Sequence, residues 1–509
     1  MFKKLALRTL LPLLLQCAFH LPVYASAADA AVSAEAQDTA RYALATYPEA
    51  MISSLAKMVS FNTVADPAVP FESNPQHTGF KRYLQQEAQR LGFDFHDYGH
   101  VVVIGMGTGS ERVGVITHGD VQPVDPAKWA RSPFELDRTS EPGKLLGRGT
   151  EDDKGPIATA LYAMKSIQDK KVLLRKRVEL YVYMAEESDW EPLKEFLKTH
   201  TPPEINITID AEYPVVTAEK GYGSIKLSLP ADAALPSGTA PVLRSLTGGF
   251  FGSQIPEDAS ATIEHATAAL EAQIRVRAQQ QQGMRYTFER QGETLTVKAL
   301  GVSAHSSKPE DGLNAISMLA DALSVQPWTG TQAADMLSFL NQLVGTGTYG
   351  EKFGQIAYRD AFMGPMTVAP TVLKQNNGEL ELNINLRRPQ GKTAYALRQQ
   401  VLDAFNGWKT QRHVAAELQV QIGEPWLQTS APQIPTLLTV FSHYTGIADP
   451  QPVAIGGGTN SRLFPNAVSF GPAMPHTVYT GHSEHEFITE KQLLLNLQMY
   501  TAVLIELAK

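Results

Sequence analysis

The chain has 509 residues, of which 43% are hydrophobic, and it carries a formal net charge of −8 at pH 7 and one cysteine. This length exceeds a single ordinary core and predicts two domains. The acidic balance argues against nucleic acid and anionic membranes as partners. One cysteine excludes an intrachain disulfide and leaves His, Asp and Glu as the expected ligands of any metal ion.

The N-terminal segment predicts export. Three basic residues precede an apolar run at Leu10–Leu15, and Ala25–Ala27 offers small residues to a signal peptidase. This pattern predicts a secretory signal peptide over residues 1–27, and therefore a periplasmic or secreted protein. A lipoprotein attached at Cys17 is the alternative. No other stretch is long enough to cross a membrane, and the alanine-rich residues 28–38 are expected to form a frayed leader.

Helical and strand-like segments alternate from Ala40 to about Gly221. This alternation predicts an α/β domain with a mixed, mostly parallel sheet and helices on both faces. In such a sheet, ligands gather beyond the C-terminal ends of the strands. The expected helices are Lys81–Leu91 and Gly155–Gln168, and the expected strands are Val101–Gly105, Val113–Thr117, Val178–Tyr183 and Ile205–Ile209.

The pattern changes between residues 222 and 425, where strands and helices mix without regular alternation. The expected elements there are the strands Ser224–Leu229, Leu295–Leu300 and Leu380–Leu386 and a helix at Leu313–Leu323. Beyond residue 425 the α/β pattern returns, with a helix at Pro435–Tyr444 and a strand at Ala467–Phe470. We therefore predict a catalytic domain made of residues 28–221 and 426–509, interrupted by an inserted α+β domain over residues 222–425.

The first candidate functional motif ends the strand Val113–Thr117. His118 follows this strand directly, and Asp120 lies two residues further on. A histidine at the end of a strand is well placed as a metal ligand, and Asp120 can hydrogen-bond its second ring nitrogen and fix its tautomer. A chance H-x-D sequence in a surface loop is the alternative.

The second motif is a glycine-rich turn, residues 147–155, that holds three carboxylates in a row before a predicted helix. A glycine-rich turn before a helix often binds phosphate, but the carboxylates would repel phosphate and instead match a cation. Alternatively, Asp152 or Asp153 caps the following helix.

The remaining motifs are also acidic or carry histidine. Glu186 and Glu187 follow a strand, where two adjacent carboxylates are costly unless a positive charge lies between them; one can bind metal while the other acts as a base. Taken singly, each position also fits a solvated loop. Together the motifs supply a full ligand set for two metal ions if one carboxylate bridges, namely His118, Asp152, Glu187, Asp210 and His482.

This ordered series resembles the dinuclear-zinc exopeptidases, a family that includes aminoacylase, glutamate carboxypeptidase and carnosinase. The series is H-x-D, G-x-G-x-x-D-D-K-G, E-E, a strand-end Asp and a late His, and the resemblance runs from about Ala50 to the C-terminus. The flanking sequences resemble the bacterial dipeptidase V branch, through Gly147–Thr150, Asp153–Pro156, Ala211–Pro214, Glu219–Gly221 and Gly456–Thr459.

The resemblance implies a role for each metal-site residue. One zinc ion would be held by His118 and Asp210, and the other by Glu187 and His482, with Asp152 bridging both; manganese or cobalt also suits these ligands. It further implies a cis peptide bond between Asp152 and Asp153. Asp120 would orient His118, and Glu186 would be the general base.

The resemblance also implies that the inserted domain is a lid that contributes to substrate binding. His305 would polarise the scissile carbonyl, and Arg387 would pair with the substrate carboxylate, because a guanidinium fork matches carboxylate geometry. Backbone donors to the same carboxylate would come from Gly457, Gly458 and Thr459. His485 and Asn460 depart from the family pattern at positions expected near the substrate.

The function implied by the resemblance is hydrolysis of dipeptides or very short peptides by zinc-activated water, with Glu186 as base. A large lid that completes the site within one chain favours a monomer over a homodimer. Two alternatives stay open at this point: an N-acyl amino acid deacylase or other amidohydrolase, which uses the same zinc chemistry, and a non-catalytic periplasmic binding protein.

Overall fold

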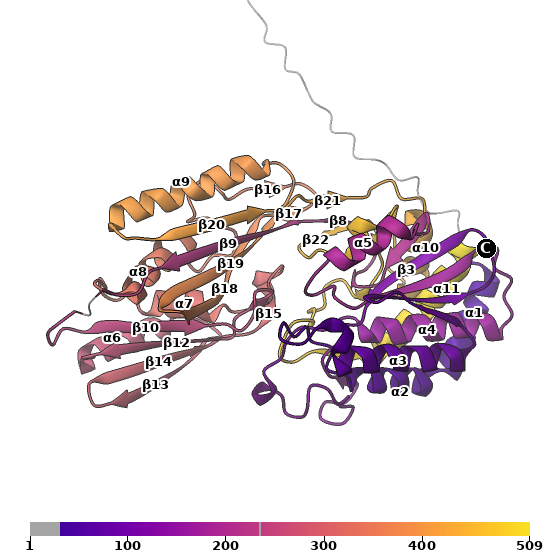
Figure 1. Ribbon diagram of the computed structural model, residues 1–509, viewed down its shortest axis with the longest axis horizontal. Helices are drawn as coiled ribbons and strands as arrows, with labels where there is room; N and C mark the ends of the chain where they lie inside the picture. The colour runs from indigo at the N-terminus through magenta and orange to yellow at the C-terminus, as the bar shows by residue number, and fades with distance from the viewer. Residues whose placement is uncertain (1–30, 234–235) are drawn as a thin grey trace, which may run out of the picture.

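The computed structural model describes residues 31–233 and 236–509. It contains two large sheets, which lie in two lobes side by side (Figure 1). The predicted signal peptide and the first residues of the predicted leader lie outside the described residues. Among those residues, none of the helices combines the length and apolar character that a membrane crossing requires.

The first sheet has nine strands and is mixed. Its central strands β5, β3, β6 and β23 run parallel to one another, while the pairings toward both edges are mainly antiparallel. In spatial order the strands are β1 (Asp94–Asp97), β2 (Val101–Met106), β5 (Arg177–Tyr183), β3 (Arg112–His118), β6 (Ile205–Thr208), β23 (Ala467–Ser469), β8 (Val216–Glu219) and β21 (Trp426–Leu427), with β22 (Val453–Ile455) also beside β8.

The centre of this sheet is buried on both faces because its strands are continuous runs of β-branched and aromatic residues. Every residue of β2 is buried, and so is every residue of β5 and β3 after the first. One face packs against the large core formed by α1 (Ala34–Thr46), α2 (Pro48–Val59), α3 (Pro75–Leu91), α4 (Lys154–Asp169), α10 (Ile434–Thr445) and α11 (Glu490–Ala508). The other face is covered by α5 (Glu191–Thr199) and by Phe464.

The second sheet has eight strands and is antiparallel throughout. Its strands in spatial order are β13 (Arg285–Gln291), β14 (Thr294–Leu300), β12 (Asp258–Glu264), β10 (Val242–Gly248), β18 (Thr367–Asn376), β19 (Glu379–Arg388), β9 (Gly221–Leu229) and β20 (Glu417–Ile422). One continuous core joins it to α6 (Ala268–Ala278), α7 (Ala315–Ala322), α8 (Gln332–Phe339) and α9 (Ala394–Arg412). The predicted fold class, a mixed α/β sheet domain interrupted by an inserted α+β domain, is therefore confirmed, but the first sheet is parallel mainly at its centre rather than over most of its pairings.

The chain enters and leaves the second sheet close to the predicted boundaries. β9 begins at Gly221, directly after β8 of the first sheet, and β21 at Trp426 returns to pair with β8. The exact division at residues 221/222 and 425/426 stays a prediction. Each predicted helix and strand overlaps an observed element of the same type, with ends that differ by a few residues.

The expectation of a frayed leader is wrong for residues 34–38. Helix α1 already begins at Ala34, where the Ser33 side chain accepts a hydrogen bond from the amide of Ala36. Alanine has the highest helix propensity, and its small side chain lets α1 approach α11 closely. Ala36, Ala40 and Ala43 are consequently fully buried.

Candidate metal centre

The metal-site candidates converge at one edge of the first sheet. Strand β3 ends at His118, β5 ends three residues before Glu186, and Asp210 lies two residues beyond β6. These three strands are adjacent and parallel in the order β5-β3-β6. Their C-terminal ends therefore meet at the same edge, as expected for ligand sites in sheets of this kind.

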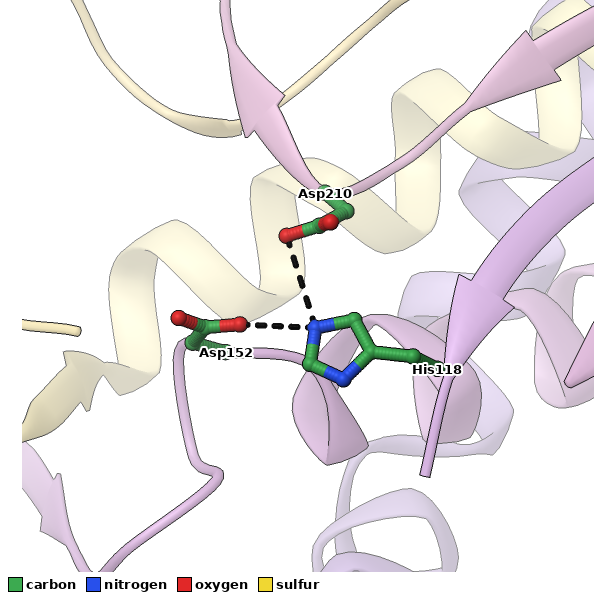
Figure 2. A group of neighbouring side chains, drawn as sticks. All are labelled: His118, Asp152 and Asp210. Carbon is green, nitrogen blue, oxygen red and sulfur yellow. Dashed lines mark hydrogen bonds and ion pairs between the residues drawn. The ribbon is translucent and has the colours of Figure 1, made fainter. Parts of the chain in front are cut away.

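His118, Asp152 and Asp210 form the first group, which we call the strand-end position. Both carboxylates point at the Nε2 atom of the His118 ring (Figure 2). Asp152 Oδ1 lies 2.8 Å from this nitrogen and Asp210 Oδ1 lies 3.6 Å from it. The imidazole is 1% exposed, so its surroundings are set by these side chains rather than by solvent.

Asp152, Glu187 and His482 form the second group, which we call the loop position. His482 Nε2 lies 2.8 Å from Glu187 Oε1 and 3.1 Å from Asp152 Oδ2. Asp152 thus presents one carboxylate oxygen to each histidine. The peptide bond between Asp152 and Asp153 is cis, as the resemblance implies. The structure therefore brings all five candidate ligands into two groups that share one carboxylate.

The chemistry of this donor set fits divalent cations. It combines two imidazoles with three carboxylates and contains no sulfur, which suits zinc, manganese or cobalt. Although burial opposes protonation, the charge of Glu187 and a hydrogen bond with Asp152 raise the pKa of His482 to about 10. Burial also raises the pKa of Asp210 to about 7, against the effect of His118. Buried carboxylates in this number need positive charge beside them, and a bound cation supplies it.

Asp120 contacts both sides of the centre. Its carboxylate oxygens accept hydrogen bonds from the backbone amides of Glu186 and Glu187, each at 3.0 Å. The Nδ1 atom of His118 lies 3.1 Å from the Asp120 carbonyl oxygen and 3.5 Å from its Oδ1. The sequence reasoning proposed the contact to His118 but missed the two amides, which fix the backbone of the Glu186–Glu187 pair.

Glu186 lies beside the ligands without belonging to either group. Burial, and then the charge of Asp210, raise the pKa of its carboxyl well above the ordinary value. Its backbone carbonyl accepts a hydrogen bond from Trp190 Nε1 at 2.6 Å, and Asn460 Nδ2 lies 3.5 Å from its Oε1. A buried carboxylate with a raised pKa is suited to accept and return a proton near neutral pH.

The inserted domain places two predicted residues at the same site. The His305 ring lies 4.3 Å from the His482 ring, centroid to centroid. Its Nδ1 accepts a hydrogen bond from the backbone amide of Ser307 at 3.1 Å, which leaves the ring proton on Nε2. Arg387 is buried; its Nε donates to Asn385 at 3.0 Å, and its guanidinium lies 5.1 Å from the Tyr222 ring centroid.

Two expectations about substrate-facing residues are corrected. The backbone amide and hydroxyl of Thr459 both donate to the buried carboxylate of Glu219, at 3.1 and 2.6 Å, so this amide is not free for a substrate. His485 lines neither cavity at the metal centre and pairs with Glu141 at 2.8 Å, with its side chain 57% exposed. Gly457 and Gly458 do line the site cavity.

Two cavities meet at the metal centre. The smaller one measures about 80 Å³, and its lining includes Asp210, Glu212, Lys308 and Tyr479. The larger measures about 540 Å³, and its lining includes Arg387 and Arg462. Both are lined by Glu186, Glu187, His305, Gly458 and His482.

Several residues of the centre could not be singled out from the sequence. Tyr479 Oη donates to Asp152 Oδ2 at 2.7 Å, and Glu212 pairs with Lys308 of the inserted domain at 2.6 Å. Glu151 and Glu486 are buried behind the ligands. The only signal for these acidic residues was their place inside the two acidic motifs, because a sequence does not separate a buried carboxylate from a solvated one.

Known proteins are similar in sequence to this chain over most of its length. It is 29% identical to a Beta-Ala-Xaa dipeptidase of Lactobacillus delbrueckii subsp. lactis, over 91% of this chain and 96% of the relative. It is 28% identical to a putative dipeptidase of Staphylococcus saprophyticus, over 91% of this chain and 97% of the relative.

Solved structures share its fold. Human carnosine dipeptidase 1 matches with a TM-score of 0.58 and 14% identity, over 94% of this chain and 99% of that one. A di-peptidase of Saccharomyces cerevisiae matches with a TM-score of 0.57 and 12% identity, over 93% and 98%. The model of Peptidase family M20/M25/M40 matches residues 114–506, which contain every metal-site residue described above. The chain belongs to this family of metallopeptidases.

Proposed function

We propose that this protein hydrolyses free dipeptides and that it binds two zinc ions to do so. The observation that carries this proposal is the opposite charge at the two ends of the joined cavities. Arg387 lies in the larger cavity, whereas Asp210 and Glu212 line the smaller one. Among the described residues that line the smaller cavity, Lys308 is the one Lys or Arg. A dipeptide has the matching charges, an ammonium at one end and a carboxylate at the other.

The dipeptide would lie across the metal centre with its C-terminal residue in the larger cavity. Arg387 pairs with the substrate carboxylate, because a guanidinium donates two parallel hydrogen bonds to it. The free amine faces the carboxylates of the smaller cavity. The 80 Å³ cavity has room for a small N-terminal residue, and the 540 Å³ cavity has room for a larger C-terminal one. The Lactobacillus relative, named for β-alanyl dipeptides, agrees with this preference.

His118 and Asp210 would hold one zinc ion at the strand-end position, Glu187 and His482 would hold the other at the loop position, and Asp152 would be a ligand of both. When bound, zinc lowers the pKa of water and polarises a carbonyl group. Glu186 accepts a proton from the attacking water and later gives it to the leaving amine. His305 donates from Nε2 to the carbonyl oxygen as negative charge develops there. Its neutral form is favoured because burial, and then the neighbouring His482, lower its pKa well below the ordinary value.

Two further proposals concern the whole protein. The N-terminal sequence supports export through a signal peptide to the periplasm or beyond. A monomer is supported by the contact between His305 and His482 within one chain, because the site then needs no second copy.

The test is hydrolysis of free dipeptides, N-blocked dipeptides and N-acyl amino acids by the mature protein, with chelator and zinc add-back. One set of dipeptides has β-alanine or another small residue at the N-terminus and a large residue at the C-terminus. A second set contains the same two residues in the reverse order. We expect zinc-restored cleavage of free dipeptides alone, faster for the small–large order. Cleavage confined to acylated substrates would assign the chain to the deacylases. No turnover of any substrate by the metal-loaded protein would favour a binding role.

A further inference from the structure

Two buried glutamates behind the metal centre hold its two ligand-bearing loops in a reciprocal arrangement. Loop A, residues 147–153, lies between β4 (Lys144–Leu146) and α4 and carries Asp152. Loop B, residues 474–486, lies between β24 (Pro472–Ala473) and β25 (Phe487–Thr489) and carries His482. Loop A follows β4 and loop B precedes β25, and these two strands pair antiparallel, so both loops adjoin the same end of one strand pair.

Glu486 of loop B binds the backbone of loop A. Its Oε1 accepts hydrogen bonds from the amides of Gly149, Glu151 and Asp152 at 3.0, 3.0 and 3.1 Å. Its Oε2 accepts from Arg148 Nη1 at 2.7 Å, and both side chains are at most 1% exposed. The carboxylate therefore binds three backbone amides through one oxygen, and it fixes the backbone of Asp152, the ligand that both metal positions share.

Glu151 of loop A binds the backbone of loop B in return. Its Oε2 accepts hydrogen bonds from the amides of Thr480 and Gly481 at 2.6 and 3.2 Å, and it also contacts the Thr480 hydroxyl at 2.6 Å. These amides directly precede His482. Each loop thus supplies one carboxylate that orders the other loop beside its metal ligand.

The backbone at His482 needs such support. His482 has a φ of 66°, in the left-handed region that non-glycine residues seldom adopt. Gln254 of the inserted domain donates to the His482 carbonyl oxygen at 2.8 Å, on the other side of the residue from the Glu151 contacts. A strained conformation persists only where its surroundings fix it, and here Glu151 and Gln254 fix it from both sides.

We propose that Glu151 and Glu486 are positioning residues for the metal ligands, and that they affect the affinities of the two metal positions differently. Glu151 acts on the loop position, because it orders only the backbone that carries His482. Glu486 acts on both positions, because it orders the amide of Asp152. This inference rests on divalent-metal binding, which family membership implies, and does not depend on which peptide or amide is the substrate.

The test measures metal binding without substrate, in the full mature chain. Glu151→Gln and Glu486→Gln are compared with the native protein by chelator competition with zinc, and by the visible absorption of bound Co²⁺. The matched control is Glu87→Gln, because Glu87 is also a buried carboxylate that pairs with arginine, in α3, and it lines neither cavity.

We expect Glu151→Gln to bind one ion with native affinity and the second about 10- to 100-fold more weakly, because a neutral amide oxygen holds the amides of Thr480 and Gly481 less strongly than a charged carboxylate oxygen does. Glu486→Gln should weaken both ions and change both Co²⁺ bands, and the control should change neither. Native affinities in Glu151→Gln, or equal weakening of both ions by it, would overturn the proposal. Because Glu151→Gln leaves the Arg148 pair intact, it decides the question even if Glu486→Gln fails to fold.

Discussion

The strand-end position and the loop position use the same kinds of ligand but are built differently. His118 and Asp210 follow the adjacent parallel strands β3 and β6, so the hydrogen-bonded core of the sheet fixes their separation. His482 lies in a loop with left-handed backbone, and it meets Glu187 from a point 295 residues away in the chain. The sheet defines one position, whereas hydrogen bonds between loops define the other.

This difference implies unequal tolerance to change. A strand end moves only if the core of the sheet moves, and that core is closely packed and resists small displacements. A loop held by a few buried carboxylates can lose its geometry when one hydrogen-bond acceptor is replaced. We therefore expect a metal ion at the loop position to be the first to dissociate when contacts around the centre are weakened.

The largest expected effect comes from Glu186, which lies next to both positions and belongs to neither. Glu186→Gln removes the proposed proton acceptor and keeps the shape of the side chain, so kcat should fall by about 10²- to 10⁴-fold. Both ions should remain, with native affinities, in metal analysis and chelator competition. Turnover close to that of the native protein would show that another group accepts the proton, and loss of an ion would make Glu186 a ligand.

Asp120 contacts both positions without belonging to either, through His118 and through the backbone amide of Glu187. Asp120→Asn replaces one of the two oxygens that accept the Glu186 and Glu187 amides with an NH₂ group, which faces those amides as a second donor. We expect metal affinity to fall by about 10- to 100-fold, with the loop position affected more because Glu187 is its ligand. Zinc titration against a chromophoric chelator measures this. If the strand-end position alone weakened, the contact of Asp120 with His118 would be the more important one.

The same contrast explains how much of the site the sequence could predict. His118 and Asp210 are predictable because each follows a β-branched apolar run, and parallel strands bring their C-terminal ends to one edge. The role of Glu486 could not be predicted. The motif G-H-S-E-H-E contains two glutamates and two histidines, and no pattern in the sequence shows which of them lie at the metal centre. His485 was expected near the substrate and instead pairs with Glu141 at the surface.

The fold shows a similar limit. Periodic apolar segments gave the helices and strands of both sheets, since burial alone determines those patterns. The start of α1 was missed because alanines carry little hydrophobic contrast. Only contact with α11, more than 440 residues away along the chain, shows that this face is buried.

The smallest effect on metal binding is expected at Glu87, which lies away from both positions. Replacing it separates an effect on the stability of the fold from an effect on metal affinity. The Glu87 carboxylate accepts hydrogen bonds from Arg90 at 2.8 and 2.7 Å and from Tyr162 at 3.1 Å. Although burial opposes it, the Arg90 contacts hold the pKa of Glu87 below its usual value. Glu87→Gln should therefore lower the free energy of unfolding at pH 7 by about 1–3 kcal/mol, with zinc affinity unchanged.

The pH dependence of this loss has a definite sign. A carboxyl whose pKa is lower in the folded protein stabilises it above the unfolded pKa, about 4.3 for Glu. That contribution disappears as the pH falls through the lower folded value. Urea unfolding of the chelator-treated native protein and of Glu87→Gln measures the difference between their free energies of unfolding. This difference should be constant from pH 7 to about pH 5 and should become smaller below pH 4. A difference that stayed constant to low pH would mean that packing of the side chain, rather than its charge, stabilises the contact between α3 and α4.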